Sequence, residues 1–283
     1  MSATKAPDTP SLLNAETRLL VILGHPIEHV RAPVVWTGLF QRFGINAVCI
    51  PVDAAPQDFD VIVSGLKRIR NLHGIILTMP HKVAALEHVD RLLDDARYIG
   101  AINLMRREAD GSWSGAMMDG KGFIRGLHAQ GICLTGKRAF VLGVGGVGQA
   151  IAWALASSGI ASLTVSDVND GRAASLVAAM RGKTDIPVNS GNGNLRDYDL
   201  VVNATPIGLH VEDPLPFPLS DLSSSTVVAD VIMEPFPSRL IVEAEKAGLR
   251  GHHGRHMMNQ QIAASAEFFG FGDYDWTAAA EFN

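Results

Sequence analysis

Short apolar runs alternate with segments of helical spacing along the first half of the chain. The apolar runs predict buried strands at residues 19–24, 47–52 and 74–78. Apolar positions three and four apart predict helices at residues 33–43, 58–70 and 83–93. Two further runs, at 101–106 and 112–117, flank Asp110-Gly111 and predict a hairpin or a pair of short strands. Strands that alternate with helices indicate an α/β layer with a mostly parallel sheet.

The second half repeats this alternation after a connecting helix at 120–131. Its apolar runs predict strands at residues 139–142, 162–167, 186–189, 200–203 and 227–232. Its helical spacing predicts helices at residues 149–158, 172–180, 237–247 and 255–269. The apolar residues of the last helix suit packing against another element, but their periodicity does not decide which half that element belongs to.

A glycine-rich turn joins the first strand and the first helix of the second half. Gly143, Gly145 and Gly148 form G-x-G-x-x-G, and Gly146 and Val147 complete the loop. In dinucleotide-binding folds the first glycine allows a tight turn, the second lets the backbone approach a pyrophosphate, and the third lets the helix pack closely. The helix N-terminus then offers unpaired N–H groups to phosphates. The order of strand, glycines and helix therefore predicts a dinucleotide site.

An acidic residue ends the next predicted strand. Asp167 lies about twenty residues after the last glycine, where a carboxylate accepts hydrogen bonds from ribose hydroxyls. A 2′-phosphate there would meet a like charge, and Val168 and Asn169 follow rather than Arg or Lys. These features predict NAD rather than NADP. The alternative is a glycine turn without a nucleotide, with Asp167 as a helix cap.

Two charged residues follow predicted strands in the first half. Lys82 comes after the strand at 74–78, and Asp119 comes after the strand at 112–117. Ligands in α/β proteins bind at the carboxyl ends of strands, so these two residues could form the acid/base pair that hydroxyl oxidation beside a nicotinamide requires. From position alone, a solvated residue in a first helical turn is the favoured interpretation of Lys82, and a helix cap is the favoured interpretation of Asp119.

Composition narrows the class of protein. The 283 residues, 47% of them apolar, allow about two domains with substantial cores. The net charge of −5 and the pI near 6.0 leave no electrostatic footprint for nucleic acid. Residues 1–18 lack the apolar core of a secretory signal, and no apolar run reaches the length of a membrane span. We therefore expect a cytoplasmic protein without membrane or nucleic-acid partners.

The cysteines and histidines predict neither disulfides nor a metal site. Cys49 and Cys133 each fall in an apolar run, which predicts two buried free thiols. The ten histidines form neither a metal-ligand spacing with cysteine nor an H-E-x-x-H motif. We accordingly expect no metal.

A series of short motifs resembles the shikimate/quinate dehydrogenase family between about Ile22 and Phe269. The motifs lie in the order and spacing of that family. Besides the glycine loop they are Gly24-x-Pro26-Ile27-x-His29 with Pro33, Thr78-x-Pro80-x-Lys82, Gly100-Ala101-Ile102-Asn103, Asp119-Gly120-x-Gly122, Asn203-Ala204-Thr205-Pro206-Ile207-Gly208, Asp230-x-Ile232 with Pro235, and Gly254-x-x-Met257-Met258-x-x-Gln261.

The resemblance implies an α/β fold with two domains and an active-site cleft between them. Residues 1–121, with 254–283 returning to them, would form the N-terminal substrate-binding domain, and 122–253 the Rossmann-like NAD-binding domain. Lys82 occupies the position of the family's catalytic lysine and Asp119 that of its partner acid. The resemblance assigns the remaining roles as follows: substrate binding to Thr78, Asn103 and Gln261, and a place near the nicotinamide to Asn203 and Thr205.

The chain departs from the family pattern at its first loop. The family usually has His-Ser-x-Ser-Pro there, and the two serine hydroxyls bind the substrate carboxylate. Here Val30 and Ala32 replace both serines. Arg31 between them could supply a bidentate partner for a carboxylate, or could simply be exposed. Other positions that are usually polar have also become apolar: Ile76, Met117, Met118 and Met233.

The sequence therefore predicts an NAD-dependent oxidoreductase of this family. It would reversibly oxidise a ring hydroxyl of shikimate, quinate or a related cyclic polyol, as in the shikimate pathway of aromatic amino acid biosynthesis. The alternative is a non-catalytic module that senses NAD or another ligand on the same fold. The Lys82 and Asp119 pair argues against that alternative, because a sensor needs no proton-transfer pair. The oligomeric state, including a homodimer, stays open.

Overall fold

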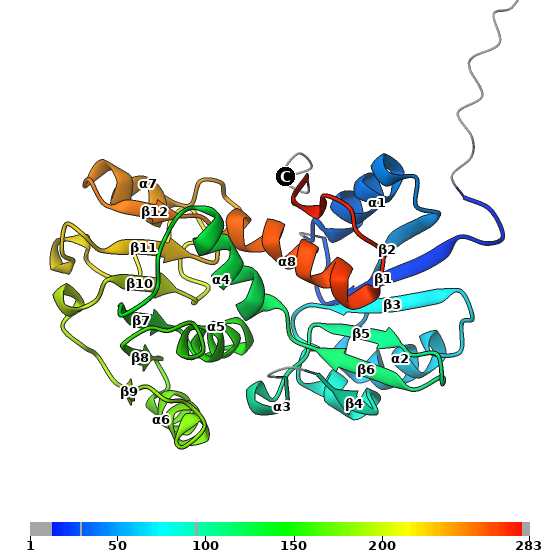
Figure 1. The fold of residues 1–283 in the computed structure, drawn as a ribbon, viewed down its shortest axis with the longest axis horizontal. Helices are drawn as coiled ribbons and strands as arrows, with labels where there is room; N and C mark the ends of the chain where they lie inside the picture. Colours follow the sequence, from blue (N-terminus) through cyan, green and yellow to red (C-terminus); the bar gives the residue numbers. More distant parts are fainter. Residues whose placement is uncertain (1–12, 29, 94–95, 279–283) are drawn as a thin grey trace, which may run out of the picture.

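The computed structural model describes residues 13–28, 30–93 and 96–278. The predicted domain ends at 1–12 and 279–283, and His29 of the first motif, lie outside the described residues. Figure 1 shows two sheets beside each other, with helices α4 and α8 running between them. This arrangement confirms the predicted α/β fold with two sheet-bearing halves.

The sheet of the first half has six strands in the described residues. In sheet order they are β2 (Ala47–Asp53), β1 (Arg18–Gly24), β3 (Leu72–Leu77), β5 (Leu104–Arg107), β6 (Trp113–Ala116) and β4 (Arg91–Leu92). Strands β1, β2 and β3 are parallel, whereas β5 pairs antiparallel with both β3 and β6. The sheet is therefore mixed, because β5 runs against both of its neighbours, and the hairpin at Asp110-Gly111 turns the chain from β5 into β6.

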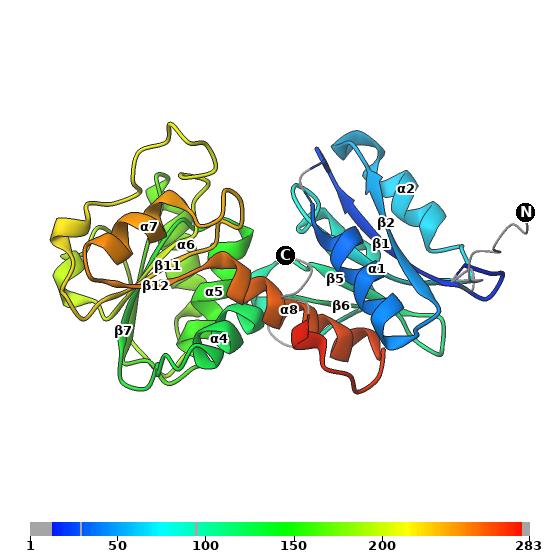
Figure 2. The ribbon, with the colours of Figure 1, turned by 90° about the horizontal axis from the view of Figure 1, so that it is seen from above.

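Helices cover both faces of this sheet around β1, which is apolar on both sides. The helices are α1 (Ala32–Phe43), α2 (Phe59–Leu66) and the short α3 (Ala96–Ile99). On β1, Val21 and Leu23 pack in the apolar cluster that contains α2, while Leu20 and Ile22 pack in the cluster that contains α1. Figure 2 shows α1 and α2 on opposite faces of β1 and β2. The continuous apolar run at 19–24 is thus that of a strand buried on both faces.

The sheet of the second half is parallel throughout its described strands. In sheet order they are β12 (Arg250–His252), β11 (Val227–Asp230), β10 (Leu200–Asn203), β7 (Arg138–Leu142), β8 (Ser162–Ser166) and β9 (Val188–Ser190). Its helices are α5 (Gly146–Ala156), α6 (Asp170–Met180) and α7 (Arg239–Lys246). On β7, Ala139 and Val141 pack with α5 and α6, while Phe140 packs with α7.

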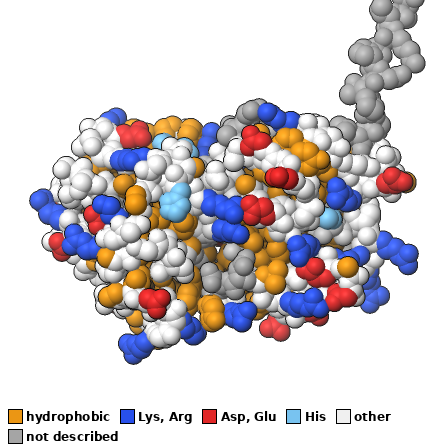
Figure 3. Space-filling model, viewed as in Figure 1, with side chains coloured by type: hydrophobic (Ala, Val, Ile, Leu, Met, Phe, Trp, Pro, Cys, Tyr) orange, Lys and Arg blue, Asp and Glu red, His pale blue; other side chains and the backbone are white. Residues whose placement is uncertain are grey.

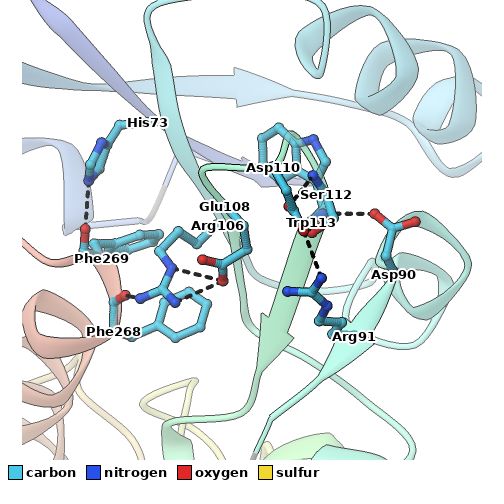
Figure 4. A network of polar contacts seen from close by, with 10 residues as sticks. All are labelled: His73, Asp90, Arg91, Arg106, Glu108, Asp110, Ser112, Trp113, Phe268 and Phe269. Carbon is cyan, nitrogen blue, oxygen red and sulfur yellow. Dashed lines mark hydrogen bonds and ion pairs between the residues drawn. The ribbon is translucent and has the colours of Figure 1, made fainter.

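Helices α4 (Asp119–Ala129) and α8 (Gly254–Phe269) connect the two halves. Helix α8 leaves the second half after β12 and ends against the first sheet, as Figure 4 shows. There the Arg106 guanidinium donates to the carbonyl oxygen of Phe268, and the His73 Nε2 lies 2.7 Å from the carbonyl oxygen of Phe269. The last helix therefore returns to the first half, a choice that its periodicity alone left open.

Two predicted helices are shorter in the structure, because the chain pairs into the sheet before the helical spacing ends. Helix α2 ends at Leu66 rather than 70, since the chain must turn to begin β3 at Leu72. The segment 83–93 contains only a 3₁₀ helix, Ala84–His88, and then strand β4, which pairs with β6 at the sheet edge. Tertiary hydrogen bonds thus override local spacing in both places.

One predicted buried thiol is wrong. Cys49 is buried on β2, and burial raises its pKa to about 12. Cys133 is exposed in the loop between α4 and β7. Its neighbours Ile132 and Leu134 are both buried, so the extended loop points every second residue inward and Cys133 outward.

Candidate active site

A buried ion pair lies where the first sheet meets helix α4. Lys82 Nζ is 2.6 Å from Asp119 Oδ2, and the two side chains are 16% and 3% exposed. Lys82 stands in the turn that follows β3, and Asp119 is the first residue of α4. The structure therefore brings together the two residues that the sequence suggested as an acid/base pair.

Two amide side chains complete the shell around Asp119. Asn103 Nδ2 and Gln261 Nε2 each donate to Asp119 Oδ1 at 2.7 Å. Asn103 Oδ1 in turn accepts from the Met118 backbone N–H at 2.9 Å. Because every partner of the Asp119 carboxylate is a side chain outside α4, the alternative of a helix cap is wrong: the N-cap is Met118, without a side-chain cap bond. We define these four residues, Lys82, Asn103, Asp119 and Gln261, as the polar cluster.

Backbone contacts hold the polar cluster together. The Lys82 carbonyl oxygen accepts from the Ile102 N–H at 2.8 Å, which ties the turn after β3 to the residue before Asn103. The preceding His81 is buried, stacks on Phe59 with ring centroids 4.3 Å apart, and places Nε2 2.6 Å from the Ala54 carbonyl oxygen. Desolvation lowers the pKa of His81. His81 thus anchors the turn that carries Lys82.

Glycines in the first turns of α4 bring Gln261 within reach of Asp119. A β-carbon on Gly122 would lie 2.7 Å from Gln261 Cβ, and one on Gly120 would lie 2.2 Å from the Ala150 carbonyl oxygen. Both distances are too short for real atoms. The glycines of the Asp119-Gly120-x-Gly122 motif therefore permit α8 and α5 to approach α4 closely, which no local pattern indicated.

The other two predicted substrate residues lie at the edge of this cluster. Thr78 follows β3, and its methyl group packs so closely on Gly24 that a β-carbon there would lie 2.3 Å away. Arg31 Nη1 is 3.9 Å from Glu234 Oε1, and the two side chains are 40% and 51% exposed. Arg31 belongs to the first half and Glu234 to the second, so this pair spans the junction.

The glycine loop lies beside the polar cluster. Gly143 has φ +96°, and a β-carbon on Gly148 would lie 1.9 Å from the Gly143 carbonyl oxygen, so the turn and the helix packing both require glycine. A β-carbon on Gly145 would meet nothing within 4 Å, which leaves backbone open to a ligand. A β-carbon on Gly146 would lie 3.9 Å from Lys82 Cδ. The predicted nucleotide loop and the predicted catalytic lysine are therefore neighbours.

The acid that follows β8 faces the same loop. Asp167 Oδ2 accepts from the Val144 N–H at 2.7 Å, and Oδ1 accepts from the Asn169 N–H at 2.9 Å. The helix after it is capped by Asn169, whose side chain accepts from the Gly171 N–H. Asp167 therefore holds the glycine loop and is not the side-chain cap of α6.

Asn203 and Thr205 form a fixed turn after β10. Asn203 Oδ1 accepts from the Thr205 N–H and hydroxyl at 3.1 and 2.6 Å, and Asn203 Nδ2 donates to the Ile207 carbonyl oxygen and to Asp230 Oδ1, both at 3.0 Å. Burial raises the pKa of Asp230, which also accepts from Ser238 and from the Ile232 N–H. Asp230 was not predicted as a site residue, although its place in the Asp230-x-Ile232 motif was a signal.

No cluster of three or more His, Cys, Asp or Glu side chains within residues 13–28, 30–93 and 96–278 could hold a metal ion. No helix in the same ranges is long and apolar enough to cross a membrane. On the face drawn in Figure 3, acidic and basic side chains are interspersed rather than gathered by sign.

This arrangement can move a proton next to a nucleotide. The Lys82 ammonium can donate to an oxygen beside it, while Asp119 balances its charge and two amides hold Asp119 in place. The open backbone at Gly145 and the N-terminus of α5 provide N–H groups for phosphates. A proton donor and an anion site at one junction suit a dinucleotide-dependent redox reaction.

Comparison with known proteins agrees with this chemistry. Residues 22–105 match the family described as the shikimate dehydrogenase substrate binding domain. The shikimate dehydrogenase (NADP(+)) of Rubrobacter xylanophilus is 34% identical over 254 residues, covering 88% of this chain and 89% of that protein.

Solved structures agree as well. The shikimate 5-dehydrogenase of Listeria monocytogenes, in complex with shikimate and NAD, has a TM-score of 0.88 at 25% identity and covers 95% of this chain and 97% of that one. The 5-ketofructose reductase of Gluconobacter sp. has a TM-score of 0.85 at 29% identity, covering 94% and 97%. On the strength of these matches along nearly its whole length, the chain belongs to the shikimate dehydrogenase family.

Proposed function

We propose that the protein is a nicotinamide-dinucleotide-dependent oxidoreductase that reversibly oxidises a ring hydroxyl of shikimate, quinate or a related cyclic polyol. The observation that carries the proposal is the buried Lys82–Asp119 pair beside Gly146 of the glycine loop. A sensor would not require such a pair, so catalysis is favoured over ligand sensing. The same proposal divides the chain into a substrate domain of 1–121 with 254–283 and a nucleotide domain of 122–253.

Lys82 would handle the proton of the reacting hydroxyl. In ketone reduction Lys82 would donate its proton to the carbonyl oxygen, while a dinucleotide bound at the glycine loop would supply the hydride to the carbon. When the hydroxyl is oxidised, the proton returns to Lys82. Asp119 keeps Lys82 Nζ at 2.6 Å, so the donor stays in one place throughout. Asn103, Gln261 and Thr78 would bind the other hydroxyls of the ring.

The glycine loop would hold the dinucleotide. Backbone N–H groups of the loop and of the first turn of α5 would face the pyrophosphate, because Gly145 presents no side chain and meets no neighbour. The loop comprises Gly143, Gly145, Gly146, Val147 and Gly148. The turn at Asn203 and Thr205 would lie near the nicotinamide, with Asn203 acting as a positioning residue since its amide is bonded within the turn.

NAD is the proposed cofactor, although the Rubrobacter xylanophilus relative is named for NADP(+). The Asp167 carboxylate, which accepts from the Val144 N–H, would repel a 2′-phosphate and would accept hydrogen bonds from ribose hydroxyls. Asp167→Asn should therefore narrow the preference for NAD over NADP, measured as the ratio of kcat/KM values. An NADP preference in the wild-type protein would contradict the assignment and direct attention to Arg172, which lines a hollow beside Asn169.

The first test is the rate of nicotinamide reduction with shikimate and with quinate, each with NAD and with NADP. Lys82→Met should lower kcat by about 10²- to 10⁴-fold, because it removes the proton-transfer group. Lys121→Met is the matched control: it removes a lysine from the same end of α4 that is 44% exposed and 3.9 Å from Glu267. Full turnover by Lys82→Met would refute the proposed role of this lysine.

A further inference from the structure

Apolar side chains from the loop between β1 and α1 and from neighbouring elements belong to one apolar cluster, which reaches Met118, the residue before Asp119. Ile27 and Val30 of this loop, and Ala32 at the start of α1, belong to the same apolar cluster as Ile76, Met118 and Met258. We call these six residues the apolar wall. No hydroxyl or amide side chain belongs to it, so it offers a ligand van der Waals contact and no hydrogen bond.

Three residues of the apolar wall are close in sequence to residues proposed for the site. Met118 immediately precedes Asp119, Ile76 lies two positions before Thr78, and Met258 lies about one helical turn from Gln261 on α8. A small ligand held by the polar cluster would therefore place another of its sides against this wall. The wall thus decides which substituent the ligand can carry on that side.

Two arginines near the apolar wall, Arg31 and Arg255, already lie next to the carboxylate of Glu234. Arg31 stands at the N-cap of α1 between Val30 and Ala32, and its guanidinium lies 3.9 Å from Glu234 Oε1. Arg255 Nη2 lies 2.7 Å from the same oxygen, and its guanidinium carbon is 3.7 Å from the centroid of the Phe236 ring. Glu234 therefore partly neutralises both arginines and adds a negative charge where an anionic ligand would enter.

A substrate carboxylate that packs against the apolar wall would lose its hydrating water and would gain no hydrogen bond from the side chains of the wall. Burial of an unpaired charge is strongly unfavourable, whereas burial of a CH or CH₂ group against apolar side chains is favourable. A hydroxymethyl group or a ring carbon therefore suits the apolar wall, and a carboxylate does not.

We propose that the substrate is an uncharged polyol or keto sugar, without a carboxylate on the side that faces the apolar wall. This inference rests on the proposed function and narrows it: the site and the redox reaction stay the same, but the carboxylates shikimate and quinate are excluded in favour of an uncharged polyol or keto sugar. As in the proposed function, Lys82 would exchange the proton with the reacting oxygen, and the bound dinucleotide would supply or accept the hydride. The Gluconobacter relative named a 5-ketofructose reductase makes 5-ketofructose the natural uncharged probe.

The test compares two ketones in the reduction direction, with NADH and with NADPH. One is 5-ketofructose, and the other is dehydroshikimate, the carboxylated ketone formed by oxidation of shikimate. We expect kcat/KM for 5-ketofructose to exceed that for dehydroshikimate by about 100-fold, roughly a factor of ten for each missing hydrogen bond to the charged group. An equal or higher value for dehydroshikimate would overturn the inference and leave the proposed function intact.

A second arm rebuilds polar contacts in the loop. The double variant Val30→Ser/Ala32→Ser should raise kcat/KM for dehydroshikimate by about tenfold or more, because its hydroxyls can donate to the carboxylate. Val34→Ser is the matched control, since Val34 lies on the same helix but is 60% exposed and outside the wall. An unchanged value in the double variant would overturn the inference, because the wall would then not be what excludes the carboxylate.

A third outcome concerns the proposed function itself. If the wild-type protein reduces neither ketone and oxidises neither shikimate nor quinate, the dehydrogenase proposal fails and the inference fails with it. If 5-ketofructose is reduced about 100-fold more efficiently than dehydroshikimate and Lys82→Met abolishes that activity, both proposals hold together.

Discussion

Two ion pairs at the junction of the halves differ in burial and in geometry. Lys82 and Asp119 are 2.6 Å apart and nearly buried, whereas Arg31 and Glu234 are 3.9 Å apart and about half exposed. The first pair is supported by two amide donors on Asp119, which fix its orientation. Water screens the second pair, so its Coulomb attraction is largely offset by the entropy of holding two long side chains.

The two ion pairs suit different roles: the buried pair suits proton transfer, and the exposed pair suits a contact between the halves that can open. A fixed, desolvated pair can present a proton donor at a constant position, which a reaction requires. A loose, solvated pair can open without a large change in free energy, which access of a ligand to the junction requires. The four predictions below test this contrast, from the largest expected effect to the smallest.

Removing one partner of the buried pair should cost the most stability. Lys82→Met leaves the Asp119 carboxylate buried with only amide donors, so we expect the free energy of unfolding to fall by about 3–5 kcal/mol in urea titrations. The double variant Lys82→Met/Asp119→Leu should lose less than the sum of the two single variants, because no uncompensated charge remains. Strict additivity would show that the two residues do not interact in solution.

A buried histidine outside the junction should make the stability of the protein depend on pH. His252 is fully buried between Phe123 and His256, and desolvation lowers its pKa from 6.5 to about 3, with further lowering by His256, His253 and Arg250. Between those two pH values the unfolded chain binds the proton and the folded chain does not. The free energy of unfolding should therefore fall as pH drops from about 6.5 toward 3, by a total of roughly 4 kcal/mol.

Urea titrations at pH 7, 6, 5 and 4 would measure this loss. His252→Phe keeps a flat ring against Phe123 and removes the titrating group, so its stability should depend less on pH. Some dependence should remain, because desolvation also lowers the pKa of His256. A wild-type stability that stays constant down to pH 4 would contradict the assignment.

The close contact of α4 with α8 should be the next most sensitive feature. Gly122→Ala would force a β-carbon to 2.7 Å from Gln261 Cβ, so we expect about 1–3 kcal/mol of destabilisation and a loss of kcat as Gln261 moves away from Asp119. Gly65→Ala on α2 is the control, since a β-carbon there meets nothing within 4 Å. It should stabilise the protein slightly, by up to about 1 kcal/mol. Equal melting temperatures for both variants would contradict the packing argument.

The exposed pair should matter least for stability. Arg31→Gln should change the free energy of unfolding by less than about 1 kcal/mol, with a smaller effect at high salt. Glu234→Gln should cost slightly more, because Glu234 also binds Arg255 at 2.7 Å. A loss above about 2 kcal/mol on Arg31→Gln would mean that this pair is as fixed as the buried one.

The pattern along the chain determined most of the secondary structure and the kinds of residue at the site. The run at 19–24, the glycine turn at Gly143 and the carboxylate at Asp167 were identifiable because each depends on neighbours a few positions away. Lys82 and Asp119 were placed after strands for the same reason, because each directly follows a short apolar run. Such signals fail at the segment 83–93, where pairing with β6 overrides helical spacing.

Only the tertiary structure decided which of these residues meet. Asp119 accepts from Gln261, 142 positions away, because glycines in α4 let α8 approach. Asn203 is held by Asp230 across two parallel strands, and Arg31 faces Glu234 across the junction. These contacts depend on how helices and sheets pack, and packing distances are not encoded in local periodicity. The sequence by itself determined the chemical groups, and the fold decided that one lysine is held rigidly while one arginine is left at the surface.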